Sequence, residues 1–415
     1  MKFVADFHIH SKYSRATSRD MDLENLDKWA KIKGIKILGT GDFTHPEWFK
    51  NLKENLMPAE TGLFKLKNSN SETRFILTSE ISCIYTKGGK VRKIHVIIFS
   101  PSLEVVEKIN TQLGWIGNLK SDGRPILGLD AKELAKIVLN ISDDCLIVPA
   151  HIWTPWFSIF GSKSGFDSIE RCFEDYSKYI FAGETGLSSD PSMNWRLSAL
   201  DGISLISNSD AHSPQKIGRE ANVFDTEISY QSITEAIKSK NPQKFLYTVE
   251  FFPEEGKYHF DGHRLCETRL SPQETKKYNG TCPVCGKPLT IGVLNRVEQL
   301  ADRPEGFKPE GAVPFKSLVP LAEIIADVLG LGVGTKEGER EYQNLIEKFG
   351  SEFNVLLDVA REELERITSP EIAEGIVRVR EGKVIREPGY DGVYGKIKIF
   401  SREEEKTFSK QSTLF

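Results

Sequence analysis

The stretch KFVADFHIH, residues 2–10, decides the fold of this chain. Its apolar character predicts a β-strand over Lys2–Phe7, with His8 and His10 following at the carboxyl end of that strand. Because successive side chains of an extended chain point to opposite faces, both imidazoles lie on one face and can bind the same ion. The stretch therefore predicts a strand that ends in a metal site.

The same pattern continues up to about residue 248, where short apolar runs alternate with amphipathic stretches. Further strands are predicted over Ile35–Thr40, Arg74–Ile81, Ile94–Ser100, Cys145–Ala150 and Ile203–Asn208. Helices are predicted over residues 22–33, 102–113, 130–140 and 230–239. Parallel strands that are each followed by a helix predict an α/β fold, a closed or distorted barrel with its chemistry at the carboxyl ends of the strands.

Metal-binding side chains recur at or just beyond the ends of these predicted strands. The further candidate ligands are Asp42, Glu80, His95, His151, Asp210 and His212. The last two repeat the alternate-residue spacing of the first histidine pair. Imidazole and carboxylate groups are suitable ligands for hydrolytic divalent ions. His45 stands alone, and we interpret it as a structural residue.

Five motifs, FHIH, SEI, HVIIF, PAH and SDAH, resemble in this order those of the PHP (polymerase and histidinol phosphatase) superfamily. The resemblance implies a distorted (β/α)7 barrel that binds two or three divalent ions and hydrolyses phosphoesters. Members use Zn, Mn or Fe, and the ions expected here are Zn²⁺, Mn²⁺ or Mg²⁺.

The resemblance also implies a ligand set for each ion. One ion would be bound by His8, His10, Glu80 and Asp210, and its neighbour by Glu80, His95 and His151. A third would be shared by Asp42 and His212. At this point the chain departs from the family, since Asp42 in GTGD stands where a histidine is usual.

Two neighbouring ions can activate a water and stabilise the phosphate, so that no separate protein nucleophile is needed. Glu80 and Asp210 are therefore the expected catalytic carboxylates. Asp190, in GLSSDPSMNWR, is a third candidate, either as a ligand or as a base that orients the water. It can equally be an Asx-turn residue. Asn194 and Arg196 follow it closely and are candidates for phosphate contact.

A second metal site is indicated by the cysteines of residues 249–304. CPVCG places Cys282 and Cys285 two residues apart, and His263 and Cys266 have similar spacing. Three thiolates and one imidazole predict a tetrahedral structural zinc, with His259 or Asp261 as substitutes for His263. Seven Lys or Arg against three Asp or Glu lie between Lys257 and Arg296. This excess is read either as a DNA-phosphate surface or as a solvated face.

The chain is accordingly divided into four parts. Residues 1–248 form the PHP phosphoesterase domain and 249–304 the zinc-binding domain, followed by a helical domain over 305–385 and a C-terminal strand and tail over 386–415. Helical patterns cover Leu318–Leu329, Glu337–Phe349 and Glu352–Ile367. The final QSTLF resembles peptides that bind a sliding clamp, such as PCNA or the bacterial clamp, through Gln411, Leu414 and Phe415.

Longer motifs resemble one PHP branch, a group of DNA repair endonucleases. They are GTGDFTHP, PAHIWTPWF, ETGLSSDPSMNWR, NSDAHSP, DGHRLC, CPVCG and PGYDGVYG. This resemblance implies cleavage of damaged DNA on the 5′ side of uracil, hypoxanthine, xanthine or an abasic site. Such cleavage would require the damaged nucleotide to be extruded from the duplex into a pocket. Trp153, Trp156 and Phe157 are candidates to line that pocket, or else they pack at the barrel mouth.

Composition excludes several classes of protein. The 415 residues carry a net charge of −4 and are 39% hydrophobic, which fits neither a disordered nor a uniformly basic chain. No apolar run has the length of a membrane span, so we expect a cytoplasmic, nucleoid-associated protein without a membrane partner. Two alternatives remain open: a small-molecule phosphatase of the histidinol phosphate type, and a clamp-associated nucleic-acid binding module with a decayed active site.

Overall fold

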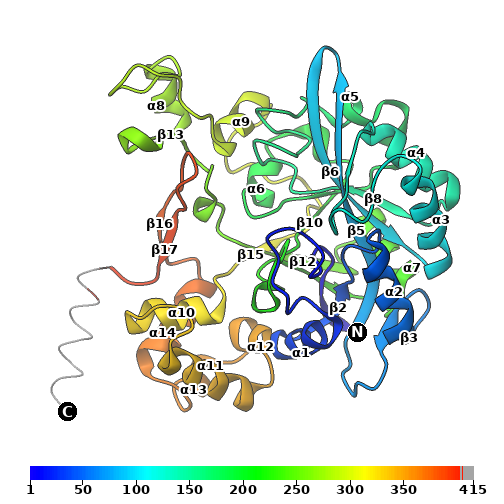
Figure 1. Cartoon of the computed structure of the whole chain (residues 1–415). Helices are drawn as coiled ribbons and strands as arrows, with labels where there is room; N and C mark the ends of the chain where they lie inside the picture. Colours follow the sequence, from blue (N-terminus) through cyan, green and yellow to red (C-terminus); the bar gives the residue numbers. More distant parts are fainter. Residues whose placement is uncertain (402–403, 405–415) are drawn as a thin grey trace.

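The computed structural model describes residues 1–401 and 404 of the chain. A mixed sheet lies at its centre, with strand order β15-β12-β11-β1-β2-β5-β4-β3, β6 and β7 beside β5, and β8 beside β6 (Figure 1). Its strands are β1 (Lys2–Asp6), β2 (Ile35–Gly39), β3 (Leu56–Pro58), β4 (Phe64–Leu66), β5 (Arg74–Lys87), β6 (Lys90–Ser100), β7 (Ile126–Leu127), β8 (Leu146–Pro149), β11 (Ala221–Asp225), β12 (Phe245–Glu250) and β15 (Phe315–Ser317). Strands β9 (Ala182–Glu184) and β10 (Ser204–Ile206) form a separate parallel pair.

The strand directions follow the prediction only in part. Strands β1, β2 and β5 are parallel, as expected from the βαβ pattern. Strand β6 instead pairs antiparallel with β5 and with β8, and β11 pairs antiparallel with β1. Gly88 and Gly89 explain the first reversal, because their φ angles of 61° and 71° suit a tight hairpin turn. The hairpin extends β5 to Lys87, so Glu80 lies within this strand and not at its end.

Helices surround the sheet. In the first part of the chain they are α1 (Leu23–Lys33), α2 (Pro46–Asn55), α3 (Leu103–Gly114), α4 (Ala131–Ile141), α5 (Ile169–Phe173), α6 (Pro191–Asn194) and α7 (Tyr230–Ser239). Helix α1 begins where the Asp22 side chain accepts a hydrogen bond from the Asn25 amide, and it ends at Gly34 with a φ of 85°. Short 3₁₀ helices are η1 (Glu174–Tyr179), η2 (Ser198–Leu200), η3 (Pro214–Lys216), η4 (Pro253–Glu255) and η5 (Arg264–Cys266).

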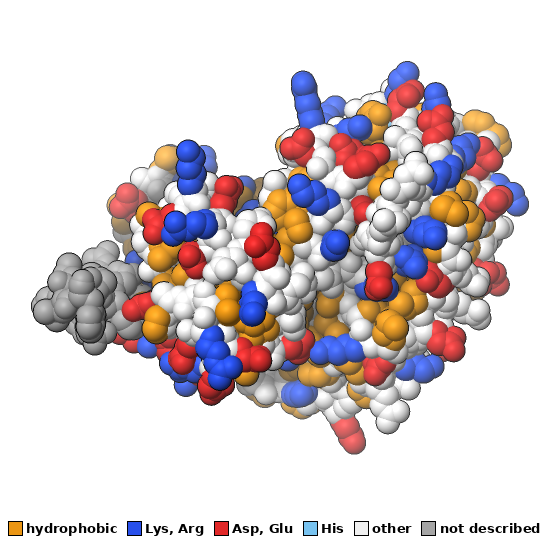
Figure 2. Space-filling view, turned by 90° about the horizontal axis from the view of Figure 1, so that it is seen from below, with side chains coloured by type: hydrophobic (Ala, Val, Ile, Leu, Met, Phe, Trp, Pro, Cys, Tyr) orange, Lys and Arg blue, Asp and Glu red, His pale blue; other side chains and the backbone are white. Residues whose placement is uncertain are grey.

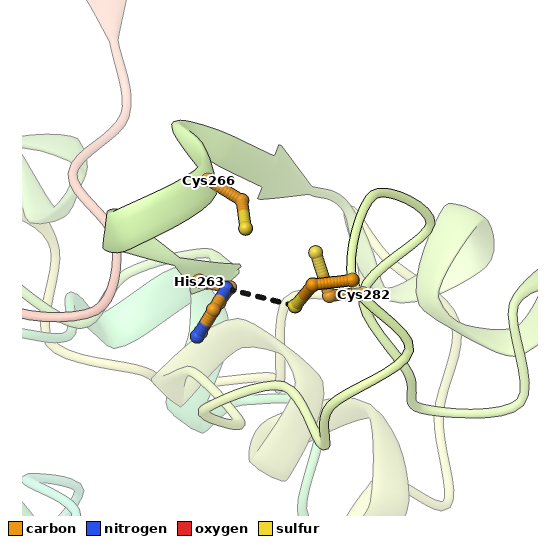
Figure 3. Close-up of side chains that lie close together, drawn as sticks. His263, Cys266 and Cys282 are labelled. Atoms are coloured by element: carbon orange, nitrogen blue, oxygen red, sulfur yellow. Dashed lines mark hydrogen bonds between the residues drawn. The ribbon is translucent and has the colours of Figure 1, made fainter.

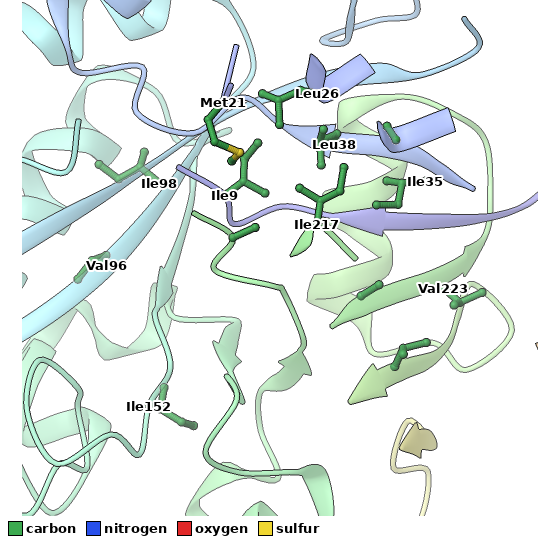
Figure 4. Packing of buried hydrophobic residues seen from close by; sticks show 14 of the residues in the cluster. Ile9, Met21, Leu26, Ile35, Leu38, Val96, Ile98, Ile152, Ile217 and Val223 are labelled. Carbon is green, nitrogen blue, oxygen red and sulfur yellow. The ribbon is translucent and has the colours of Figure 1, made fainter. Parts of the chain in front are cut away.

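Both faces of the central strands are buried. On β6, Val96 and Ile98 belong to one apolar cluster, whereas Ile97 and Phe99 belong to a second cluster. Figure 4 shows part of the first cluster, including Ile9, Met21 and Ile98. Because alternate side chains serve opposite faces, a strand buried on both sides must be apolar throughout. This is why β6 contains the unbroken apolar run VIIF over residues 96–99.

The remaining elements form two groups in Figure 1. Strands β13 (Asp261–His263) and β14 (Thr268–Leu270) and helices α8 (Pro272–Lys277) and α9 (Val293–Leu300) make up the first. The second contains α10 (Leu321–Leu329), α11 (Lys336–Phe349), α12 (Glu352–Leu357), α13 (Arg361–Leu364) and α14 (Pro370–Arg380), with the hairpin of β16 (Ile385–Glu387) and β17 (Lys396–Lys398) between the groups. The single helix predicted over Glu352–Ile367 is wrong, because the backbone is extended at Ala360.

The proposed domain boundaries can be placed on this fold. Residue 248 falls inside β12, and β15 pairs in parallel with this strand, with Thr248 opposite Phe315. A strand that follows the cysteine-rich segment thus joins the central sheet. None of the described helices combines the length and apolar character needed to cross a membrane.

Candidate metal centre

The first cluster of ligand atoms forms where β1 and the loop after β10 meet. His8, His10, Glu80 and Asp210 place their ligand atoms within 4.8 Å of one another. His10 Nε2 lies 3.0 Å from Asp210 Oδ1 and 3.4 Å from Glu80 Oε2. His8 Nε2 lies 3.5 Å from the same Glu80 oxygen. The structure therefore brings together the four residues that the sequence assigns to one ion.

Glu80 joins this cluster to a second one. Its other oxygen, Oε1, lies 2.7 Å from His95 Nδ1 and 3.0 Å from His151 Nε2. The two imidazole nitrogens are 3.2 Å apart. Each Glu80 oxygen thus faces a different pair of histidines. A carboxylate in this position can bridge two ions.

The donor set fits divalent cations. Ligand atoms about 2.1 Å from a tetrahedral ion lie about 3.4 Å from one another, close to the separations of 3.0 to 3.7 Å in the first cluster. His8 Nε2 is buried and has no hydrogen-bond partner within residues 1–401 and 404. Such an orphaned nitrogen, aimed at two carboxylates, is explained by an ion between them.

Electrostatics agree with this fit. Burial raises the pKa of Glu80, but His95, Arg124 and His8 oppose it and hold that pKa well below its ordinary value. Burial likewise raises the pKa of Asp210, and the two neighbouring histidines, His8 first, reverse the effect. Burial lowers the pKa of His95 to about 4, which leaves a neutral imidazole. The carboxylates and His95 thus have the protonation states that metal ligands require. Burial lowers the pKa of His8, His10 and His151, but the neighbouring carboxylates outweigh it and raise all three, so binding of an ion there would release protons.

The backbone is strained at the ligands. His151 and Asp210 have positive φ angles of 29° and 47°, and Asp42 has 49°. Such conformations cost on the order of 1–3 kcal/mol each and persist where surrounding contacts demand them. Their concentration here is typical of a functional site.

Glu184 was not recognised from the sequence. The Nδ1 atom of His8 lies 2.9 Å from Glu184 Oε1. The same carboxylate accepts hydrogen bonds from the His151 backbone amide at 2.8 Å and from Asn208 Nδ2 at 2.9 Å. Glu184 thus orients one histidine from each cluster, as a carboxylate behind a metal-bound imidazole does. The only sequence signal is its place at the end of the run FAGE.

Asp42 has a comparable position behind His10. Its Oδ1 lies 3.0 Å from His10 Nδ1, and its Oδ2 accepts hydrogen bonds from the Ser11 amide and from the hydroxyls of Ser11 and Ser14. The carboxylate is buried and its acceptor positions are used by these donors. In this arrangement Asp42 is placed to orient the His10 imidazole. His212 lies against the same histidine, with its ring centroid 4.5 Å from that of His10, and its Nδ1 is 2.9 Å from the carbonyl oxygen of Asp210.

Arg124 is a further residue that the sequence did not indicate. Its guanidinium donates to Glu80 Oε2 at 3.0 Å, and about a quarter of the side chain, 27%, is exposed. The group thus lies beside the bridging carboxylate with part of its surface open to an anion. No local motif marks it, because the contact joins residues 44 positions apart.

The cysteine cluster is formed as predicted from its spacing. His263 ends β13, Cys266 lies in η5, and Cys282 and Cys285 belong to the loop after α8. Figure 3 shows His263, Cys266 and Cys282 pointing toward one another, and His263 Nδ1 lies 3.5 Å from Cys285 Sγ. Desolvation raises the pKa of Cys282, but hydrogen bonds from Thr268 and nearby amides lower it to about 6. These four groups suit a tetrahedral zinc.

The proposed substitutes for His263 are used elsewhere. Asp261 accepts hydrogen bonds from the Gly292 amide and from Asn295. His259 is buried and stacks on Phe260, with ring centroids 5.5 Å apart. Neither belongs to the cysteine cluster.

Asp190 and three of the four substrate candidates have structural contacts. Asp190 caps α6 by accepting from the Met193 amide at 2.9 Å, which matches the Asx-turn interpretation. Trp153 is 1% exposed and donates its indole N–H to the buried Asn194 at 2.7 Å. Arg196 pairs with Glu298 at 2.6 Å. In this conformation these four groups are engaged in contacts within the protein.

Trp156 does line an open cleft, with 38% of its surface exposed. The cleft has a volume of about 800 Å³ and contains His95, His151 and Asp210 in its wall. The wall also contains apolar and charged groups, among them Phe157, Leu187, Phe251, Tyr258, Lys216, Arg219, Glu255 and Glu323. Three of the candidate metal ligands thus line a cavity large enough for a nucleotide. Gln411, Leu414 and Phe415 lie outside the described residues.

Comparison with known proteins matches this architecture. A family model described as PHP-associated matches residues 195–242, and one described as MJ0043 C-terminal domain matches residues 320–383. A crystal structure of the lesion-specific endonuclease PfuEndoQ from Pyrococcus furiosus superposes with a TM-score of 0.86 and 34% identity, over 98% of this chain and 99% of that chain.

Two further relatives were found. A structure of endonuclease Q in complex with a 27-mer duplex containing an abasic lesion has the same TM-score of 0.86 and 34% identity, over 98% of each chain. The uncharacterized protein MJ0043 of Methanocaldococcus jannaschii is 34% identical over 323 residues, which are 74% of this chain. That match spans only 39% of the Methanocaldococcus protein.

The bridged histidine and carboxylate clusters, together with the PHP-associated segment, define a PHP-type metal-dependent phosphoesterase. Within this class the chain belongs to the endonuclease Q family of lesion-specific nucleases.

Proposed function

We propose that this protein is a DNA repair endonuclease that hydrolyses the phosphodiester 5′ to uracil, hypoxanthine, xanthine or an abasic site. The observation that carries the proposal is the position of the Glu80 carboxylate. Each of its two oxygens faces a different pair of histidines, and the cluster lies beside a cleft of about 800 Å³. The 34% identity to the lesion-specific Pyrococcus enzyme supports the choice of DNA as substrate.

The residues of the centre would hold two divalent ions, Zn²⁺, Mn²⁺ or Mg²⁺. When bound, such ions supply an activated water and positive charge for an in-line displacement at phosphorus. His8, His10 and Asp210 would hold one position, and His95 and His151 the other, with Glu80 common to both. Since Asp42 lies behind His10, the residues favour two ions over three.

The protein's other groups would orient the substrate. Arg124 is held by Glu80 and can donate its remaining N–H groups to a phosphate oxygen. Trp156 packs edge-on against Tyr258, with ring centroids 5.5 Å apart, and this aromatic pair can receive an extruded nucleotide. An abasic nucleotide would enter the same cleft and leave the base position empty.

Two finer proposals concern partners and location. We infer that QSTLF, through Gln411, Leu414 and Phe415, binds a sliding clamp and brings the enzyme to the nucleoid in the cytoplasm. The support is the peptide's composition, in which a polar side chain precedes two apolar ones. Deletion of residues 411–415 should abolish clamp binding in a pull-down without changing the nicking rate on naked DNA.

One experiment tests the main proposal. The metal-loaded protein is incubated with labelled duplexes that contain a single uracil, a single hypoxanthine or no lesion, and separately with histidinol phosphate. A nick 5′ to the lesion alone is expected. Phosphate release from histidinol phosphate would favour the phosphatase alternative, and binding without cleavage would favour the decayed binding module. Asp210→Ala should abolish nicking with little loss of structure, and retained activity would contradict the assigned centre.

A further inference from the structure

A second cleft, distinct from the metal centre, is lined by residues of the β5–β6 hairpin, the 161–167 loop, α5 and α9. Figure 1 shows where the hairpin and the two helices lie in the fold. Its volume is about 550 Å³. Six cationic side chains and one carboxylate line it: Lys87, Lys90, Arg92, Lys163, Arg171, Arg296 and Asp167. The view in Figure 2 shows positive and negative side chains interspersed over another face. The cleft itself concentrates six positive side chains against one negative side chain.

The positive charge is only partly compensated. Lys87 pairs with Asp130 and Glu174, while Arg171 and Arg296 share Asp167. Lys90, Arg92 and Lys163 form no ion pair within residues 1–401 and 404. Uncompensated cations repel one another, so this arrangement favours an anion between them.

Two buried polar atoms in the cleft lack partners. Arg92 Nε and Ser162 Oγ have no hydrogen-bond partner in the described part of the chain. The Arg92 guanidinium is fixed in place, because it donates to the Gly165 carbonyl oxygen and stacks 4.1 Å from the Phe166 ring centroid. A rigid guanidinium and an unused hydroxyl on residues that line the same cleft form a donor set suited to a phosphate group.

The loop that presents these donors is tightly constrained. Residues 161–165 read GSKSG, and the Gly165 amide donates to the Gly161 carbonyl oxygen at 2.9 Å. A Cβ atom on either glycine would collide with neighbouring backbone. The turn therefore fixes the backbone of Ser162 and Lys163 at the cleft.

The same loop leads to the catalytic cleft. The Phe157 amide donates to Ser164 Oγ at 3.2 Å, and the His95 amide donates to the Phe157 carbonyl oxygen at 3.0 Å. Arg296 on α9 donates to the Phe160 and Phe166 carbonyl oxygens from the other side. A DNA strand bound at the metal centre can thus continue past this loop. The cations extend from the hairpin to α9, which suits a polymer better than a single small ion.

We propose that this cleft binds a backbone phosphate of the DNA away from the lesion nucleotide. The inference rests on the proposed function for the nature of the strand. Contacts to phosphate position a duplex and carry no sequence information. The cleft would therefore contribute affinity for damaged and undamaged DNA alike.

The test compares Ser162→Ala and Lys163→Gln with a matched control, Lys108→Gln, which changes an exposed lysine on α3. Binding of labelled duplexes, undamaged or with one uracil, is measured by anisotropy between 50 and 200 mM KCl. Lys163→Gln should reduce the slope of log Kd against log salt by about 1. Between 50 and 200 mM KCl, the affinity of this variant should therefore fall by a factor that is about 3.5-fold smaller than for the wild type. Ser162→Ala should weaken both duplexes by about tenfold at unchanged melting temperature.

Lys108→Gln should match wild type, and the nicking rate at saturating protein should be unchanged in all variants. Wild-type slopes and affinities in both cleft variants would overturn the proposal. The proposal would also be overturned if inorganic phosphate stabilised the wild-type protein but not Ser162→Ala while both proteins bound DNA equally. The ligand of the cleft would then be a free anion. If the wild-type protein binds the duplexes but does not nick them, only the proposed function is contradicted. The proposal for this cleft would stand, because the affinities that test it are measured without cleavage.

Discussion

The carboxylate of Glu184 offers a direct test of how the metal centre is organised. It is fully buried and contacts the His8 imidazole, the His151 amide and the Asn208 side-chain amide. Glu184→Gln keeps the size of the side chain but replaces one acceptor oxygen with a donor. If the remaining oxygen faces His8 and Asn208, the new NH₂ group faces the His151 N–H.

The expected magnitudes follow from these contacts. A buried N–H without an acceptor costs about 1–3 kcal/mol of the free energy of unfolding. Loss of the carboxylate behind His8 should weaken metal binding about 10- to 100-fold, as changes behind metal-bound imidazoles generally do. This factor corresponds to about 1.4–2.8 kcal/mol of binding free energy.

The assay is a competition titration of the protein with a chromophoric chelator, combined with urea unfolding of the metal-free protein. Glu352→Gln is the matched control. Glu352 is also buried and accepts from the Leu321 amide and the Tyr342 hydroxyl while pairing with Lys33, but it lies in the helical part of the chain. This control should lose stability and keep its metal affinity.

The reasoning would be refuted by a Glu184→Gln protein whose metal affinity stays within twofold of wild type. It would also be refuted by equal losses of metal affinity in both variants, since a general loss of stability would then explain the effect.

Other predictions concern zinc, packing and pH. Cys282→Ser should release the structural zinc, measured by atomic absorption, and lower the melting temperature; unchanged zinc content would contradict the site. Trp153→Ala should cost about 3–5 kcal/mol in urea unfolding because the indole is buried, whereas Trp156→Ala should retain stability and lower lesion-DNA affinity. Burial raises the pKa of Glu250 from 4.5 to about 8. The folded state therefore keeps a proton that the unfolded state loses, so the contribution of Glu250 to the free energy of unfolding should be fully present below about pH 4.5 and be lost as the pH rises to about 8. Glu250→Gln should flatten this decline.

Much of the metal centre could be predicted because its ligands follow local rules. The alternation of an extended chain places His8 and His10 on one face, and the turn in CPVCG brings two thiols to one point. Both arrangements depend on a few neighbouring residues. The strand directions were predicted less well, because apolar runs do not reveal whether neighbouring strands run parallel or antiparallel. The glycine pair at residues 88–89 was the local signal for one reversal.

The sequence by itself thus determined the ligand types, their placement near strands and the cysteine cluster. Only the tertiary structure decided which carboxylates face an ion and which stand behind a histidine. Glu184 reaches His8 across 176 positions, and Asp42 reaches His10 across 32. It also decided that Trp153 is packed while Trp156 is open to the cleft. The physical reason is that local geometry sets the direction of a side chain, whereas packing between distant segments sets what that side chain meets.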